Sequence, residues 1–157
     1  MRTYARVLRL VLITLSIAGL LVALNAVPGA ATPASGVTGT TLARGTNQSP
    51  GTIPIKQGMD VVVATNKFAP GGSSGWHSHP GGAIVVVVSG QLTDYNSIGG
   101  HCVATTYTAG QAFVERPGVL QLAVNNGTTD TVVYVTFPSV PDGAPSRTDE
   151  AAPADCP

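Results

Sequence analysis

Charged residues and cysteines are scarce in this sequence. Lysine and arginine total 8, aspartate and glutamate total 8, and charged residues make up 10% of the 157 residues. A net charge of zero argues against a nucleic-acid-binding protein, which usually carries a basic patch. Two cysteines cannot build a multi-disulfide scaffold or a four-cysteine zinc site. The 43% of hydrophobic residues excludes a wholly disordered chain, and the length favours a single domain.

Sequence motifs for several enzyme classes are also missing. The sequence has no phosphate-binding loop and no dinucleotide-binding fingerprint. No pair of carboxylates stands out as an acid–base device, and nothing indicates nucleophilic catalysis. The function must therefore be sought in other residues.

The first 31 residues differ in character from the rest. Three arginines within nine residues precede 18 uncharged residues, from Leu10 to Val27, and small residues follow at 28–31. This pattern is typical of a secretory signal peptide. About 20 apolar residues also span a bilayer, so an uncleaved membrane anchor through residues 10–27 is the alternative. We favour cleavage, and in either case we expect the remainder to be exported, as a secreted or envelope-associated protein.

The remainder of the chain is predicted to be all-β. The composition of residues 32–51 indicates a flexible linker, and that of residues 139–157 an irregular tail. Between them, β-branched runs bounded by glycine and proline predict strands at 61–65 and 84–88. Weaker strands are predicted at 103–108 and 111–114, and apolar runs predict two further strands at 120–124 and 131–137. An Asn-Gly pair between the last two strands predicts a β-hairpin. Many short strands, with no amphipathic helix after residue 31, indicate a sandwich or a small barrel.

Two of the three histidines lie close together, at His77 and His79. In a strand, residues two apart point to the same face, so the two imidazoles are expected side by side. Such a pair is half of a metal site. The other interpretation is an ordinary pair of surface or hydrogen-bonded histidines.

The spacing around this pair resembles the first motif of the cupin family. That motif has a glycine, five residues, His-x-His, three or four residues, a glutamate, six residues and a second glycine. Gly71, His77, His79 and Gly90 stand in register, but Ala83 occupies the glutamate position. The second cupin motif is matched by Gly110, Gly118 and Asn125, with the proline displaced by one to Pro117 and Gln121 at the histidine position.

The resemblance implies a single-domain cupin, a double-stranded β-helix or jelly-roll-like barrel, over residues 52–138. Cupins commonly hold a divalent metal with three histidines and one glutamate. Carried over, His77 and His79 match two ligands, Gln121 offers only a neutral carbonyl oxygen, and Ala83 offers nothing. We therefore expect at most one weakly bound transition metal (Fe, Mn, Ni, Cu or Zn), because the carboxylate that offsets the metal's charge is missing.

Glu115 is the one acidic residue that could replace the missing carboxylate. It lies two positions after Phe113, so its side chain either faces the interior or forms a rim pair with Arg116 or Lys67. We favour the rim pair. The third histidine, His101, lies in a predicted loop and is expected to face solvent.

Two aromatic residues are assigned to the ligand pocket together with Glu115. Trp76 stands beside the histidine pair, as either the wall of a ligand pocket or a core or rim residue. Phe113 is expected to line the barrel core. Cys102 and Cys156 are predicted to form a disulfide because the chain is exported, with two free thiols as the alternative.

These features support three functional hypotheses. The first is an exported binding protein that holds a small ligand in its barrel, with or without a weak metal. The second is a metal-dependent enzyme of the dioxygenase or isomerase type, because two histidines leave coordination positions open. The third is an envelope-associated structural domain with a vestigial pocket. We expect no nucleic-acid partner, and a homodimer is possible because cupins often pair through their sheets.

Overall fold

The computed structural model describes residues 35, 38, 40–50 and 52–157. Residues Thr40–Pro157 form one compact unit. The predicted signal peptide or anchor, residues 1–31, lies outside the described residues. Among the residues that are described, no helix is long and apolar enough to cross a membrane.

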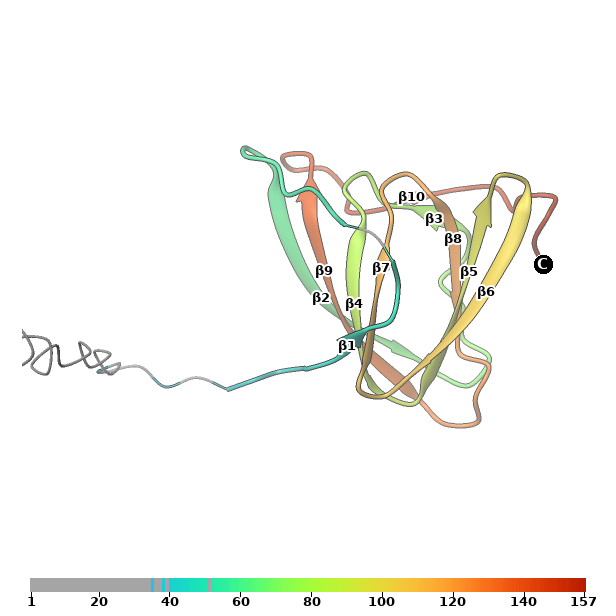
Figure 1. Cartoon of the computed structure of the whole chain (residues 1–157), viewed down its shortest axis with the longest axis horizontal. Helices are drawn as coiled ribbons and strands as arrows, with labels where there is room; N and C mark the ends of the chain where they lie inside the picture. Colours follow the sequence, from blue (N-terminus) through green and yellow to red (C-terminus); the bar gives the residue numbers. More distant parts are fainter. Residues whose placement is uncertain (1–34, 36–37, 39, 51) are drawn as a thin grey trace, which may run out of the picture. The chain divides into compact units, whose positions relative to one another are not determined.

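In this unit every regular element is a strand, as the sequence predicted (Figure 1). The strands are β1 (Thr46–Asn47), β2 (Asp60–Phe68), β3 (His77–Ser78), β4 (Ala83–Ser89), β5 (Gln91–Ile98), β6 (His101–Thr108), β7 (Gln111–Glu115), β8 (Leu120–Val124), β9 (Thr131–Val140) and β10 (Thr148–Asp149).

The strands form two five-stranded sheets, seen on the left and right of Figure 1. The first sheet has the order β1-β7-β4-β9-β2, and the second has the order β10-β3-β8-β5-β6. Neighbouring strands are antiparallel, except that β1 pairs with β7 in parallel. Because β7, β8 and β9 alternate between the sheets, the chain crosses the barrel repeatedly, as in a jelly roll.

The core lies between the two sheets, where the alternation of each strand places its apolar side chains. In β4, Val85 and Val87 are buried, whereas Ile84 and Val88 face outward and are exposed. The apolar cluster also receives side chains from β5, β6, β7, β8 and β9. Phe113 is fully buried there and its ring stacks on Tyr107, with the centroids 4.2 Å apart. Phe113 is thus a core residue, as expected.

The predicted hairpin at the Asn-Gly pair is wrong. The flanking strands β8 and β9 belong to different sheets and do not pair. The loop between them is held instead by the buried side chain of Asn125. Its amide nitrogen donates to the carbonyls of Phe68 and Thr129, and its oxygen accepts from the backbone of Gly127. These bonds stabilise a connection that crosses from one sheet to the other.

Strand β5 was not predicted, because Gln91–Ile98 is mostly polar and has no β-branched run.

Both ends of the barrel domain also extend further than predicted. Thr46–Asn47, within the predicted linker, forms β1 at the edge of the first sheet. Gly45 stands just before β1 and packs against the backbone of β7. A Cβ atom there would lie 2.7 Å from the carbonyl oxygen of Gln111.

The C-terminal tail, residues 141–157, runs across one end of the second sheet (Figure 1). It is not wholly irregular, because Thr148–Asp149 forms β10 against β3. Further along, Cys102 and Cys156, the pair for which the sequence predicted a bridge, are joined by a disulfide. The tail is therefore attached to the barrel both by a strand pairing and by a covalent link.

Candidate metal centre

Three buried side chains with metal-binding atoms converge between the sheets. They are His77 in β3, His79 just beyond it, and Glu115 at the end of β7, exposed by 5%, 3% and 5% respectively. One ligand atom from each lies within 4.8 Å of the other two, and this is the one such group among the described residues. The sequence predicted the two histidines as neighbours on one face, and the structure brings them together.

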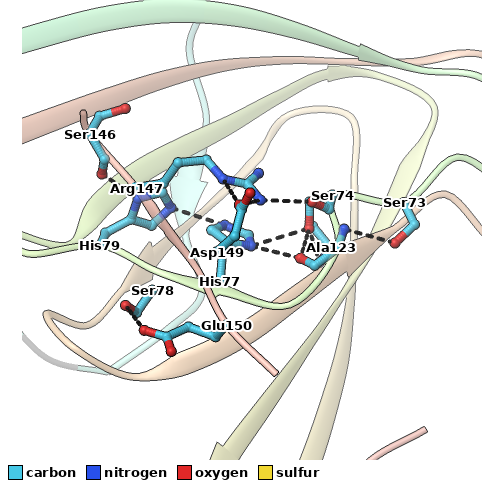
Figure 2. A network of polar contacts seen from close by, with 11 residues as sticks. Ser73, Ser74, His77, Ser78, His79, Ala123, Ser146, Arg147, Asp149 and Glu150 are labelled. Carbon is cyan, nitrogen blue, oxygen red and sulfur yellow. Dashed lines mark hydrogen bonds and ion pairs between the residues drawn. The ribbon is translucent and has the colours of Figure 1, made fainter. Parts of the chain in front are cut away.

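The hydrogen bonds of the two imidazoles determine which nitrogen faces the centre. Nδ1 of His77 lies 2.8 Å from the carbonyl oxygen of Gly75, and Nδ1 of His79 lies 2.7 Å from that of Ser146 (Figure 2). A carbonyl only accepts hydrogen bonds, so each Nδ1 carries the hydrogen. In the neutral imidazoles, both Nε2 atoms are therefore left as lone-pair donors that point inward.

The two Nε2 atoms lie only 3.1 Å apart, and Nε2 of His79 lies 3.2 Å from a carboxylate oxygen of Glu115. Three electron-pair donors thus face one another. Such a convergence is stable only when a cation, either a proton or a metal ion, lies among them. Two imidazoles and a carboxylate suit a divalent transition metal, so the donor set fits the ion that the cupin resemblance implies.

The backbone conformation of residue 75, two positions before His77, explains why a glycine stands there. Its φ of 69° is in the left-handed region, which glycine adopts without strain. The turn brings the Gly75 carbonyl back to Nδ1 of His77. Burial lowers the pKa of His77, and the neighbouring His79 and Arg147 lower it further, against the opposing effects of the bond to Gly75 and the charge of Glu115. The imidazole of His77 is therefore neutral at neutral pH and free to bind a metal.

The rim pair that the sequence favoured for Glu115 does not form. Lys67 pairs instead with Asp130 at 2.6 Å, and Arg116 is exposed. Glu115 faces inward because it follows Phe113 by two positions in β7 and shares its buried face. Its register partner in β4 is Ala83, the position at which the cupin resemblance expected the glutamate.

Gln121 is almost fully buried, at 1% exposure, and lies in register with His77 across β3 and β8. Neither its amide oxygen nor its amide nitrogen has a hydrogen-bond partner among the described residues. Buried amides rarely remain without partners. The unpaired oxygen beside His77 is therefore available as a further ligand.

A cavity of about 70 Å³ adjoins the centre and is lined by His77, His79 and Glu115. Most of its remaining wall is apolar, formed by side chains of β2, β4, β5, β8 and β9. Arg147, from the C-terminal tail, lines it too, and among the described residues no other arginine and no lysine does. The sequence analysis did not identify Arg147, because nothing in its proline-rich surroundings indicates a site.

The tail contributes to the centre in two ways, both visible in Figure 2. The carbonyl of Ser146 accepts the hydrogen of His79, and the guanidinium of Arg147 donates to the carbonyl of Ser74 at 3.1 Å and pairs with Asp149. Nearby, Ser78 donates to Glu150 at 2.9 Å. The tail therefore orients a metal-binding histidine and places a positive charge at the cavity.

The predictions for Trp76 and His101 have different outcomes. Trp76 is adjacent to His77 in sequence but does not line the cavity; it is buried, and its indole N–H donates to the carbonyl of Pro157 at 3.2 Å. It is thus a rim residue covered by the tail. His101 is exposed, as expected, but it begins β6 rather than lying in a loop.

One serine motif was overlooked in the sequence. Residues 71–75 read Gly-Gly-Ser-Ser-Gly and match the Gly-x-Ser-x-Gly pattern. The pattern marks a nucleophile when a strand leads through it into a helix. Here no helix follows, and the hydroxyl of Ser73 accepts a hydrogen bond from the backbone of Gly75. The match is a loop turn rather than a nucleophile elbow.

The fold and the site together define a small two-sheet barrel with a buried histidine–carboxylate centre. This is the architecture of the cupins, and residues 65–137 match the family model described as "Cupin domain". Residues 65–137 are therefore similar to a cupin domain.

Comparisons with individual proteins agree with this assignment. The chain is 30% identical over 93 residues to germin-like protein 1 from Brassica napus, an alignment that covers 58% of this chain and 45% of the relative. The chain thus spans less than half the length of that curated relative.

Two solved structures show the same fold. One is oxalate decarboxylase from Lactobacillus farciminis in a formate complex, with a TM-score of 0.51, 17% identity, and coverage of 58% of this chain and 27% of the other. The second is oxalate decarboxylase from Bacillus subtilis, in a study of its Mn(II) centres, with a TM-score of 0.51, 19% identity, and coverage of 57% and 23%. At these identities the likeness concerns the fold alone.

Proposed function

We propose that this chain binds one divalent transition metal at His77, His79 and Glu115, and binds a small carboxylate-bearing ligand beside it. The observation that carries the proposal is the convergence of the two Nε2 atoms and a carboxylate oxygen within 4.8 Å. A vestigial pocket would gain nothing from holding three electron-pair donors buried together. The buried centre therefore favours a working metal site over a structural domain with a remnant pocket.

Glu115 changes the expected strength of the site. Without a carboxylate, two imidazoles and an amide oxygen would hold a metal only weakly. Glu115 adds a buried negative charge that offsets part of the charge of a divalent ion. The amide oxygen of Gln121, which has no other partner, completes a set of two nitrogen and two oxygen donors. We therefore propose a firmer site than the sequence alone predicted.

The size of the cavity and the residues that line it indicate the class of ligand. Its volume of about 70 Å³ corresponds to about five water-sized positions, enough for a small organic acid. Arg147 is 38% exposed at its mouth, and its bonds to Asp149 and Ser74 use Nε and one terminal nitrogen. The other terminal nitrogen has no bond among the described residues, so its N–H groups are available to a carboxylate.

Each residue then has a defined task. The metal, when bound, acts as a Lewis acid that polarises a ligand oxygen. Arg147 orients the ligand's carboxylate, and the apolar walls limit access of water. The carbonyls of Gly75 and Ser146 hold the two imidazoles in the orientation that presents Nε2.

A metal-dependent enzyme of the dioxygenase or isomerase type is the second candidate. It is favoured by one observation, a donor set with two histidines and one carboxylate, which leaves coordination positions for substrate or O₂. Turnover of a carboxylate by the metal-loaded protein, measured with and without oxygen, distinguishes an enzyme from a binding protein.

The metal proposal is tested by elemental analysis of the full chain, purified without chelator or metal-binding tag. We expect close to one equivalent of Fe, Mn, Ni, Cu or Zn, lost in both His77→Ala and Glu115→Gln. His101→Ala, which removes an exposed histidine outside the centre, is the matched control and should keep full metal content. Full metal content in His77→Ala would overturn the proposal.

We also propose that the protein is exported. The support is the arginine-led apolar segment at residues 1–31 and the Cys102–Cys156 disulfide, since disulfides persist in oxidising compartments. Mass spectrometry of the protein from the culture medium and from the membrane fraction tests this. A cleaved N-terminus near residue 31 in the medium is expected, whereas retention of the intact chain in the cytoplasm would contradict export.

A further inference from the structure

A second cavity lies apart from the metal centre. It has a volume of about 180 Å³ and lies between β5 and β6 of the second sheet, β7 of the first sheet and the segment Ser49–Pro50. None of its lining residues lines the cavity beside the metal centre. The two cavities therefore share no lining residue.

The polar feature of this second cavity is Asp94, which is only 3% exposed. One of its carboxylate oxygens, Oδ2, accepts a hydrogen bond from the side chain of Asn96 at 2.6 Å. The other oxygen, Oδ1, has no partner among the described residues. The other buried side-chain atoms without a partner in this part of the chain belong to Gln121, which we have assigned to the proposed metal site.

An unpaired buried carboxylate oxygen is expensive, because its desolvation is not offset by a bond. Burial raises the pKa of Asp94 to about 7, and the charge of Glu115 raises it too, against the lowering effect of the bond from Asn96. A group that donates hydrogen bonds and carries a positive charge would remove this penalty. Oδ1 itself is buried, but Asp94 lines the cavity, so a positively charged ligand held there would lie beside its carboxylate.

The other lining residues narrow the ligand class. Thr105 and Tyr107 of β6 bring hydroxyl groups, and Val103, Ile98 and Val114 form apolar walls. Burial and the nearby Asp94 raise the pKa of Tyr107, so its hydroxyl keeps its proton and remains available for hydrogen bonding. The cavity thus has one acidic position, neutral polar groups beside it and apolar walls.

Metal ions and anions fit this cavity poorly. Asp94 is its one carboxylate and it has no histidine, so it lacks the donor number that divalent ions need. An anion would be repelled by Asp94 and by the nearby charge of Glu115. Arg116 also lines the cavity, but its residue is exposed, so its charge can stay in solvent.

We propose that this second cavity binds a small organic ligand with a primary ammonium group, whose N–H donors bond to the carboxylate of Asp94 while its carbon chain contacts the apolar walls. An ammonium has three donors, enough for the carboxylate and for the two hydroxyls of β6. A charge-assisted bond of this kind is roughly twice as strong as a neutral one. The proposal does not depend on the metal centre.

The test uses n-butylammonium as the probe and the full chain at pH 8, with binding measured by calorimetry. We expect saturable binding by the native chain and at least a tenfold weaker affinity in Asp94→Asn, which keeps the side-chain size and an acceptor for Asn96. The neutral analogue 1-butanol should bind at least tenfold more weakly than the ammonium. His77→Ala, which disables the metal centre, should bind the probe as tightly as the native chain.

A second variant covers the case in which Asp94→Asn misfolds. Val103 lines the cavity but is 47% exposed, so Val103→Phe can fill the space with little disturbance of the core. We expect this variant to fold and to lose the probe. The proposal is overturned by an absence of saturable binding, by equal binding of 1-butanol, or by equal affinity in the folded Asp94→Asn or Val103→Phe variant. Loss of binding in His77→Ala would also overturn it, because the probe would then occupy the metal centre.

Discussion

Glu115 lies directly across the β4–β7 ladder from Ala83, and both side chains are buried on the same face. Opposite residues in an antiparallel pair have Cβ atoms about 4.5–5.5 Å apart. The carboxylate that the cupin pattern places on one strand is thus supplied in this chain by the adjacent strand. The metal centre keeps its acid although the motif has lost its glutamate.

This relationship predicts a rescue experiment. Glu115→Ala should lower metal affinity at least tenfold, because the two imidazoles lose their negative partner. The double variant Ala83→Glu/Glu115→Ala should recover much of that affinity, because the new carboxylate enters the same space from the other strand. Metal titration of the chelator-treated proteins measures both effects. If the double variant binds metal no better than Glu115→Ala, a carboxylate at position 83 cannot take the place of the one at position 115 in the metal site.

Replacing Gln121 should affect metal binding and stability in opposite directions. Gln121→Leu removes a buried amide without partners and keeps a similar size, so the metal-free protein should gain about 1–2 kcal/mol in free energy of unfolding. The same change removes an oxygen donor and should weaken metal binding. Urea unfolding with and without saturating metal checks both results. A loss of stability in the metal-free state would show that the amide has a partner, such as water.

Arg147 should act on the ligand and not on the metal. Arg147→Gln is expected to leave metal content unchanged while weakening the binding of glycolate to the metal-loaded protein at least tenfold, because it removes a charge-assisted bond. Arg147→Lys should fall between the two, since lysine keeps the charge but not the paired N–H groups. Asp149→Asn, which changes the exposed partner of Arg147, is the control. Equal glycolate affinity in all four proteins would exclude Arg147 from the ligand site.

The disulfide should influence the metal centre through the tail. Cys102 and Cys156 are 54 residues apart, and a bridge across that separation is worth about 4 kcal/mol in the chain-entropy model. Cys156→Ser should lower the free energy of unfolding by about that amount. It should also weaken metal binding, because Ser146 would hold His79 less firmly. Unchanged metal affinity in the folded variant would show that β10 alone positions the tail.

Asp94 predicts a pH dependence of stability. Its pKa is about 7 in the folded protein, against an ordinary value of 3.8, so the folded state binds more protons between these pH values. The free energy of unfolding contributed by Asp94 therefore falls as the pH rises from about 4 to about 7, by up to about 4 kcal/mol. Asp94→Asn should lack this slope and be more stable than the native chain at pH 8.

The comparison should be made on metal-free protein with no amine in the buffer. The difference between native and variant isolates Asp94 from the other carboxylates, whose contributions appear in both proteins. A difference that does not change with pH would mean that Asp94 ionises in the folded state at its ordinary pKa.

The sequence predicted those parts of the fold that local pattern controls. Apolar and β-branched runs predict six of the strands, and His77 and His79 share a face because they are two residues apart. Local pattern does not determine to which sheet a strand belongs. The Asn-Gly turn therefore suggested a hairpin, although Asn125 stabilises a connection that crosses from one sheet to the other. Strand β5 was missed because Asp94 and Asn96 occupy inward positions that a pattern expects to be apolar.

The centre was predicted in part for a similar reason. The alternation Phe113–Glu115 pointed inward, but the general rule that charges stay at the surface outweighed it. Only the pairing of β4 with β7 shows why a charge is buried there, opposite Ala83 and beside His79. Arg147 and the Ser146 carbonyl depend on where a tail of low β-propensity returns, which no short-range pattern determines.

The position of the tail also bears on the order in which the centre is completed during synthesis. The cupin match ends at residue 137, yet Ser146 and Arg147 lie beyond it. The ribosome therefore releases both histidines and Glu115 well before the groups that orient His79 and charge the cavity. A nascent chain cannot present the finished site to a metal until its last residues have folded back. A chain shortened at the family boundary would lack β10 and the end of β9 as well as the groups that complete the centre.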